Sequence, residues 1–314
     1  MLEPRTIVSA SSYPVVALQN GYSSRGLLLE ADPGQSFDAI DARWLMQQLK
    51  ASGYLLLRGF DANLEAFCSL VRRHSSRVSL DPARSFHGGN VAQKVDAGTD
   101  AMGLHLENGN SPFRPDLVWF YCERAARQGS QTTVCDGCRV WERMTDFARE
   151  QFHGSEFLYR RRVDEQKWKR FVQHQTADSI TLDQIQISDL MKLVDAEEST
   201  TIEDVGGGAI VYSYRASAVH QTLFGSGLAW ANSIFGPSYN YEAPQITFAD
   251  GHAIPGVLLE EMRTLTADLT EDIDWHSGDI VLIDNTRVMH GRRSIVDTGR
   301  KIFNALSYID ARFL

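Results

Sequence analysis

The sequence is poor in cysteine, with four in 314 residues. Four unevenly placed cysteines are too few for the disulfide framework that stabilises small secreted domains. Cys135 and Cys138 form one C-x-x-C pair, but a tetrahedral zinc site needs a second ligand pair of similar spacing, and the sequence has none. We therefore expect free thiols, buried or partly exposed, at Cys68, Cys122, Cys135 and Cys138.

Long apolar runs and basic blocks are also missing. No stretch reaches the roughly 18 apolar residues that a membrane span needs, and Met1–Arg5 lacks the basic and apolar regions that begin a signal peptide. The 40 acidic residues outnumber the 31 basic ones, and the net charge of -9 does not suit a nucleic-acid surface. These absences predict a cytoplasmic protein that acts on a small molecule, with no membrane or nucleic-acid partner, and they leave a homo-oligomer open.

Repeats, low-complexity tracts and Pro/Ser-rich linkers are absent, so we expect residues 1–314 to form a single domain. Apolar residues at helical spacing predict helices at 38–51, 64–73, 140–152, 182–196 and 257–269. Short β-like runs predict strands at 54–57, 91–95, 117–122, 209–214, 280–283 and 301–308. Because the strands are separated by helical segments, the pattern favours an α+β fold with a β-sandwich or jelly-roll core and helical insertions.

The segment His105-Leu106-Glu107 is the first motif that carries chemistry. On an extended segment, side chains two positions apart point to the same face, so an imidazole and a carboxylate could grip one ion. The motif alone is weak, because nine histidines and 40 acidic residues predict about one such match by chance. A hydrogen-bonded polar pair without a metal stays open at this point.

The run from Trp275 to Arg293 is more informative. A turn at Ser277-Gly278-Asp279 leads into a hydrophobic strand, and we expect Asp284-Asn285 to close that strand so that the chain swings His290 outward. A surface loop that holds a histidine by chance is the alternative for this motif taken by itself.

Together these segments resemble a known family. The residues that carry the resemblance are His105-Leu106-Glu107, the run Phe113–Cys122, the turn Gly129–Thr132, the run Gly278–Arg292 and a late Arg300. In this order and spacing, the region from about Gly53 to Asp310 looks like the taurine dioxygenase-like (TauD/TfdA) family of Fe(II)/2-oxoglutarate-dependent oxygenases. The resemblance implies a double-stranded β-helix (jelly roll) flanked by helices, with a helical insertion between the two metal-ligand segments.

The resemblance also implies roles for single residues. His105, Glu107 and His290 would be the iron ligands, and Arg300 would bind the distal carboxylate of 2-oxoglutarate with help from Thr132. Two positions depart from the family pattern: the turn before Thr132 reads Gly-Ser-Gln-Thr instead of Gly-Gly-Asp-Thr, and Asn304 stands where some members carry a second arginine. The second departure argues against a sulfonate or similarly strong anion as substrate.

Physical chemistry supports the same site. Two histidines and one carboxylate leave three positions open on an octahedral ion, enough for a keto acid and O₂, and the planar fork of Arg300 can pair with both oxygens of a carboxylate. A zinc-dependent hydrolase and a non-catalytic jelly-roll binding protein are the alternatives from other classes. Arg300 argues against the hydrolase, and the intact triad argues against the binding protein.

The outcome of the reaction follows less directly. Because Glu107 keeps the carboxylate whose loss would open a position for halide, the resemblance favours a hydroxylase over a halogenase, with desaturation or cyclisation by the same cofactors left open. Alternation along the last strand places Asn304 on the same face as Arg300. With Gln93 and Asn108, Asn304 would line a substrate site that suits an amino-acid-derived or peptide-like molecule of specialised metabolism.

Overall fold

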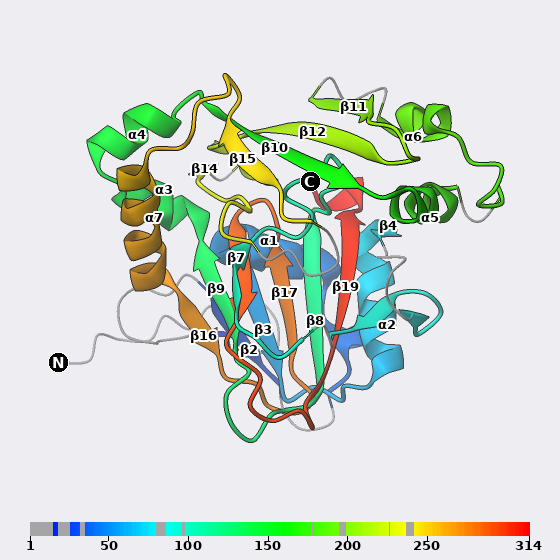
Figure 1. Cartoon of the computed structure of the whole chain (residues 1–314). Coiled ribbons are helices and arrows are strands. Elements are labelled where there is room, and N and C mark those ends of the chain that lie inside the picture. The colour runs from blue at the N-terminus through cyan, green and yellow to red at the C-terminus, as the bar shows by residue number, and fades with distance from the viewer. Residues whose placement is uncertain are drawn as a thin grey trace.

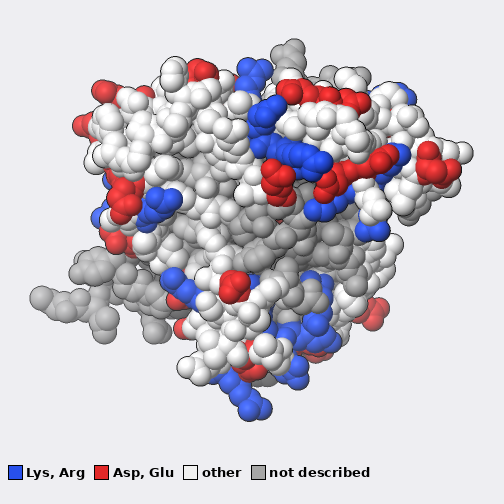
Figure 2. Space-filling view, in the orientation of Figure 1, with Lys and Arg blue, Asp and Glu red and all other residues white. Residues whose placement is uncertain are grey.

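The protein is described by a computed structural model, shown in Figure 1. The described residues are 15–17, 26–31, 35–79, 86–95, 98–176, 179–194, 199–225, 227–236 and 242–314. Within these ranges no helix has the length and apolar character needed to cross a bilayer. Figure 2 shows acidic and basic side chains intermixed on the upper part of the viewed face.

A large, mostly antiparallel sheet forms the centre of the molecule. Its strands in spatial order are β1 (Val15–Ala17), β2 (Leu27–Glu30), β3 (Tyr54–Arg58), β17 (Ile280–Asp284), β8 (Leu117–Arg124), β19 (Lys301–Ile309), β6 (Ala92–Lys94) and β5 (Phe86–His87), with β4 (Ser75–Ser79) pairing with β19. Five strands of this sheet were predicted from the sequence, and the structure confirms them with ends that differ by a few residues. They are the strands predicted at 54–57, 91–95, 117–122, 280–283 and 301–308.

Two helices cover the outer face of the large sheet, α1 (Ala42–Ser52) and α2 (Leu64–His74). The predicted helix at 38–51 begins later than expected because the side chain of Asp41 accepts a hydrogen bond from the backbone N–H of Trp44 and caps α1. A short 3₁₀ turn, Phe37–Ala39, occupies the preceding residues. Gly53, with a φ of 79°, ends α1 in a conformation that favours glycine and turns the chain directly into β3.

A second, four-stranded sheet faces the inner side of the large one. Its order is β16 (Glu271–Ile273), β9 (Thr132–Asp136), β18 (Val288–Arg292) and β7 (Met102–His105). Val281 and Ile283 of β17 pack with Val134 and Val288 in an apolar layer between the sheets, whereas Ile280 and Leu282 belong to the layer beneath the helices. This two-layer arrangement is consistent with the predicted jelly-roll core.

The helical insertion expected between the two metal-ligand segments contains strands as well as helices. It adds a further sheet of β11 (Thr200–Asp204), β12 (Ile210–Ser217), β10 (Glu156–Val163) and β15 (Gln245–Phe248), flanked by α5 (Glu165–Gln175) and α6 (Ile187–Val194). In Figure 1 this unit lies above the two core sheets; we call it the upper lobe. Of its four strands only β12 overlaps a predicted one, because the charged side chains of β10 and β11 mask their alternation.

The remaining helices lie beside the smaller sheet (Figure 1). They are α3 (Gly137–Arg143), α4 (Asp146–Phe152) and α7 (Gly256–Leu269), and a short pair, β13 (His220–Gln221) and β14 (Leu228–Ala229), lies near α3. The single helix predicted at 140–152 is wrong: the side chain of Thr145 accepts from the N–H of Ala148 and starts a new helix. The helix predicted at 182–196 is limited to α6, and residues 195–196 lie outside the described residues.

Candidate metal centre

Two histidines that are far apart in the sequence lie opposite each other in the smaller sheet. β7 and β18 run antiparallel, with His105 in register with His290. Residues in register on antiparallel strands point to the same face, and the two imidazole centroids are 4.5 Å apart. The predicted outward swing of His290 is wrong. The chain turns at residues 285–287, crosses to the second sheet and carries His290 inward at 4% exposure, beside the ring of Phe120.

Glu107 completes the group from just beyond the end of β7. It lies in a turn rather than on the extended segment expected from the sequence, because Leu106 is buried in a separate apolar cluster and the chain bends after it. One oxygen of Glu107 lies 3.4 Å from Nε2 of His290. The ligand atoms of His105, Glu107 and His290 all lie within 4.8 Å of one another.

The buried side chain of Asn285 holds the Glu107 segment in place. Its Oδ1 accepts a hydrogen bond from the backbone N–H of Glu107 at 2.9 Å, and its Nδ2 donates to the carbonyls of Glu107 and Pro115 at 3.0 and 2.8 Å. Asn285 is fully buried and lies in the turn that leads from β17 to β18. One amide therefore ties the turn before His290 to the segment that carries Glu107.

The imidazole of His105 is oriented by the main chain. Its Nδ1 lies 2.8 Å from the carbonyl oxygen of Gly103, which fits an Nδ1–H donor and directs Nε2 to the role of ligand atom. The donor set is then two imidazole nitrogens and one carboxylate that lie close together. This set suits a non-haem Fe(II) ion with open positions.

Two buried arginines lie on the same inner face as the triad. Arg292 lies two positions after His290 on β18, and Arg300 immediately precedes β19; they are 4% and 8% exposed. The only hydrogen bond that the guanidinium of Arg300 makes to the described residues goes to the carbonyl of Val95, at 3.3 Å. Burial, with a contribution from Arg292, lowers the pKa of Arg300 to about 10, so that the guanidinium stays charged at neutral pH. Two positive charges held this close favour a bound dianion such as a dicarboxylate.

Thr132 is buried, whereas Arg293 is half exposed. Thr132 is buried in register with Arg292, and its hydroxyl accepts a hydrogen bond from Nε1 of Trp275. No hydrogen bond joins Thr132 to Arg300 among the described residues. Arg293, unlike the buried Arg292, is half exposed and pairs with Asp272. The position of Arg292 two residues after His290 on a strand is the sequence signal that places both side chains on one face.

Asn304 and Gln93 lie in register on β19 and β6 and are 4% and 1% exposed. Asn304 lies between Ile302 and Leu306, which pack in the layer between the two core sheets, so its side chain faces the interior as expected. Its Oδ1 has no hydrogen-bond partner among the described residues. A buried acceptor without a partner is costly, and a bound ligand could satisfy it.

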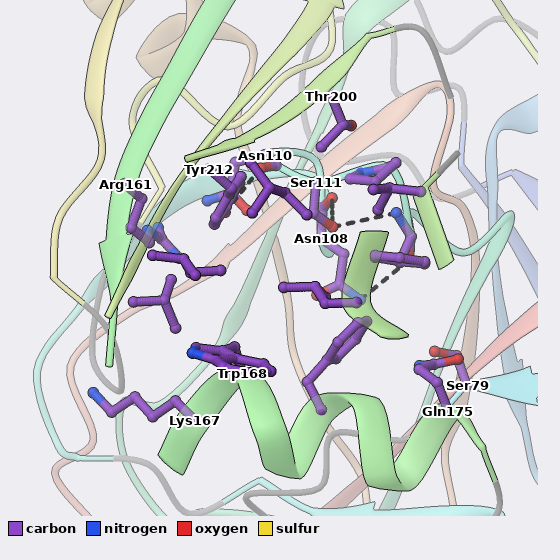
Figure 3. Close-up of a pocket in the computed structure, with 18 of the residues that line it drawn as sticks. Ser79, Asn108, Asn110, Ser111, Arg161, Lys167, Trp168, Gln175, Thr200 and Tyr212 are labelled. Atoms are coloured by element: carbon purple, nitrogen blue, oxygen red, sulfur yellow. Dashed lines mark hydrogen bonds between the residues drawn. The ribbon is translucent and has the colours of Figure 1, made fainter. Parts of the chain in front are cut away.

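A cavity of about 200 Å³ opens beside Glu107, between the core and the upper lobe. Figure 3 shows Asn108 near its centre, Arg161 and Tyr212 on the strands of the upper lobe, and Trp168 on α5. Asn108, with a φ of 53°, donates a long hydrogen bond to the carbonyl of Phe113. Of the three residues expected to contact substrate, Asn108 lines this cavity, whereas Gln93 and Asn304 do not.

The four cysteines do not take part in the triad. Each is buried and none forms a disulfide, as expected from their number and spacing. Burial raises the pKa of the Cys122 thiol to about 12 and raises that of Cys135 still further. Both therefore stay protonated near neutral pH.

Residues 25–306 match the family described as taurine catabolism dioxygenase TauD, TfdA family. A clavaminate synthase-like protein of Arabidopsis thaliana is 28% identical over 284 residues, 84% of either chain. The dapdiamide synthesis protein DdaC of Enterobacter agglomerans is 22% identical over 309 residues, 90% of this chain and 91% of that protein.

Solved structures agree in fold. PvcB from Pseudomonas aeruginosa superimposes with a TM-score of 0.65 at 15% identity, over 98% of this chain and 95% of that one. PvcB is described as an Fe, alpha-ketoglutarate dependent oxygenase from an isonitrile synthetic pathway. At this level of identity the likeness concerns the fold alone.

Proposed function

Since the chain belongs to the TauD, TfdA family of dioxygenases, we propose that it uses this site to hydroxylate an unactivated C–H bond of an amino-acid-derived or peptide-like small molecule in specialised metabolism. The observation that carries the proposal is the convergence of His105, Glu107 and His290 within 4.8 Å. The similarity to a dapdiamide synthesis protein supports specialised metabolism as the setting. We assign the two facing core sheets to a double-stranded β-helix.

The cofactors of the family fit the residues present. Two imidazole nitrogens and a carboxylate, with one side left open, are the donor set of Fe(II) oxygenases. When bound, iron together with 2-oxoglutarate and O₂ supplies the oxidising power for C–H oxidation. We assign Arg300 to the distal carboxylate of 2-oxoglutarate because its buried fork can form a bidentate pair there, with Arg292 and Thr132 beside it.

The other residues position the reactants and exclude water. Asn285 sets the Glu107 segment, the carbonyl of Gly103 sets the ring of His105, and the ring of Phe120 packs against that of His290. We propose that Asn304 offers its unpartnered oxygen to the substrate or to a water molecule that contacts it. We propose that Asn108, which lines the cavity beside Glu107, is another polar group near the reacting carbon.

Hydroxylation is preferred over the alternatives on particular grounds. Because Glu107 keeps its carboxylate beside the histidines, no coordination position is opened for a halide, so we do not favour halogenation. Desaturation and cyclisation use the same cofactors and would need a different substrate pose. A zinc hydrolase would leave the buried Arg292 and Arg300 without a role.

The test begins under anaerobic conditions. Adding Fe(II) and then 2-oxoglutarate should produce a weak visible charge-transfer band, and adding O₂ should release succinate. The His290→Ala variant serves as the control, because it removes one ligand while the backbone of β18 can still pair. Neither band nor succinate with the wild-type protein, or full turnover by His290→Ala, would contradict the proposed function.

A further inference from the structure

Strand β10 contains three consecutive arginines that differ sharply in their surroundings. Arg160 and Arg162 are exposed and pair with Glu203 and Asp164 at 3.1 and 2.7 Å. Arg161 is 8% exposed. It lies on the same face of the strand as Phe157, Tyr159 and Val163, which are all buried. Alternation along the strand therefore turns one charge of the three inward.

The inward face of β10 forms part of the cavity beside Glu107 (Figure 3). Arg161 is in register with Tyr212 of β12, and both side chains line this space. Helix α5 closes another side with Lys167 and Trp168. The indole of Trp168 is fixed because its Nε1 donates to the carbonyl of Gly208 at 2.9 Å.

The cavity wall carries more positive than negative side chains. Among the described residues that line it, Arg161 and Lys167 are cationic and Glu107 is the single acid. Glu107 belongs to the metal triad, where a bound cation would balance its charge. The rest of the wall is therefore positive, and burial of Arg161 strengthens its attraction for an anion relative to an exposed arginine. Asn304 carries no charge, so a group that binds an anionic substrate in this cavity has to come from the upper lobe.

The apolar part of the wall is mostly aliphatic, and it includes three aromatic rings besides that of Tyr212. The rings of Phe113 and Phe171 have centroids 4.8 Å apart, and Trp168 lies in the same wall. A volume of about 200 Å³ is below the roughly 300–1,000 Å³ of sites for drug-sized ligands. The space suits a small molecule with a flat apolar body.

We propose that the substrate is a small carboxylate with an aromatic body, and that Arg161 determines this specificity by binding the carboxylate. Phe113, Trp168 and Phe171 hold the body, and the end of the molecule that points to Glu107 presents the reacting C–H bond. This inference rests on the proposed function. Arginine suits the role because its planar fork pairs with both oxygens of a carboxylate.

The test compares N-acetyl-L-phenylalanine with its neutral amide, N-acetyl-L-phenylalaninamide, by titration calorimetry. Excess 2-oxoglutarate is present, so that the acid does not simply occupy the pocket at Arg300. For a charge-assisted pair we expect the wild-type protein to bind the acid about 10-fold or more tightly than the amide. Arg161→Gln should remove the preference, and Arg161→Lys should retain part of it.

Arg160→Gln is the matched control, because it removes the neighbouring exposed charge from the same strand. It should keep the full preference for the acid. Thermal unfolding of each variant separates a lost contact from a lost fold. Equal affinity of the wild-type protein for acid and amide, no binding of the acid, or an unchanged preference in a folded Arg161→Gln variant would each overturn the inference.

These titrations require neither iron nor O₂. Absence of succinate release would therefore contradict the proposed function and leave the binding result standing. Efficient oxidation of a neutral substrate in preference to its acid would overturn the inference alone.

Discussion

Among single residues, the buried guanidinium of Arg300 makes the sharpest prediction. If it forms a bidentate pair with 2-oxoglutarate, Arg300→Ala should weaken co-substrate binding by about 1.5–3 kcal/mol, or roughly 10- to 150-fold. The iron requirement should change far less, because Arg300 is not among the three proposed ligands. The measurement is a titration of succinate release with 2-oxoglutarate and, separately, with Fe(II).

Arg293→Ala is the control for Arg300, because Arg293 is exposed and pairs with Asp272. An unchanged 2-oxoglutarate titration in Arg300→Ala, with a large change in Arg292→Ala, would transfer the role to Arg292.

Asn304 allows a test of substrate contact. Its Oδ1 has no partner among the described residues, so Asn304→Ala should cost the fold little. Substrate binding should weaken by about 1–3 kcal/mol if the amide bonds to the substrate. We expect the KM for substrate to rise much more than the KM for 2-oxoglutarate. An equal rise in both would show that Asn304 supports the keto-acid pocket instead.

The triad could be predicted from residue types and spacing, because few combinations of imidazole and carboxylate serve one ion. The inward direction of His290 could not, since it depends on a crossing between sheets that no local pattern contains. Arg161 was missed for a related reason. In the sequence, three consecutive arginines look like a solvated surface, and only the phase of β10 shows that the middle one is buried.

At the scale of elements, the turn between β17 and β18 positions the triad. Asn285→Ala would leave the N–H of Glu107 and the carbonyls of Glu107 and Pro115 without their partner. An unsatisfied buried group costs about 1–3 kcal/mol, so we expect a clearly lower Tm together with weaker Fe(II) binding. Thermal unfolding and a metal titration are the two measurements.

Asn285→Asp separates the contributions of this amide. It keeps an acceptor for the N–H of Glu107 but sets a carboxylate oxygen against the carbonyls of Glu107 and Pro115, so the Tm should fall at least as far as in the alanine variant. Normal iron affinity in Asn285→Ala would show that the Glu107 segment holds its position without this contact.

Strands with long runs of buried apolar residues could be predicted from the sequence, and elements rich in charged residues could not. β17 and β8 stand out in the sequence because five and six of their residues in a row are buried. β10 and α5 carry arginine, lysine and glutamate on their exposed sides, so their apolar faces are diluted. The break between α3 and α4 depends on one capping threonine, which apolar spacing does not reveal.

For the whole molecule, pH dependence of stability follows from a buried histidine. His74 is fully buried and its Nδ1 bonds to the carbonyl of Leu70. Burial, with a smaller contribution from Arg73, lowers its pKa from 6.5 to about 4. The unfolded chain therefore binds more protons between these values. Stability is fully present above pH 6.5 and falls by about 3 kcal/mol as pH drops to about 4.

His74→Phe should flatten part of this dependence, because a phenyl ring can pack against Trp119 and Phe313 without titrating. The measurement is the free energy of unfolding between pH 4 and 7. His276→Gln removes an exposed histidine and should leave the slope in place. A slope that is the same in His74→Phe and the wild-type protein would mean that the pKa of His74 is the same in the folded and unfolded states.

The main-chain ladder between β7 and β18 has a consequence for how such enzymes diversify. The two histidines are held by strand pairing within the core, whereas Arg161, Trp168 and Phe171 come from the upper lobe, which the chain inserts between those strands. The residues proposed for oxidation and those proposed for substrate choice thus belong to different parts of the chain, which could be exchanged separately. A lobe transplanted from a relative could redirect the enzyme to a new molecule without rebuilding the centre that performs the oxidation.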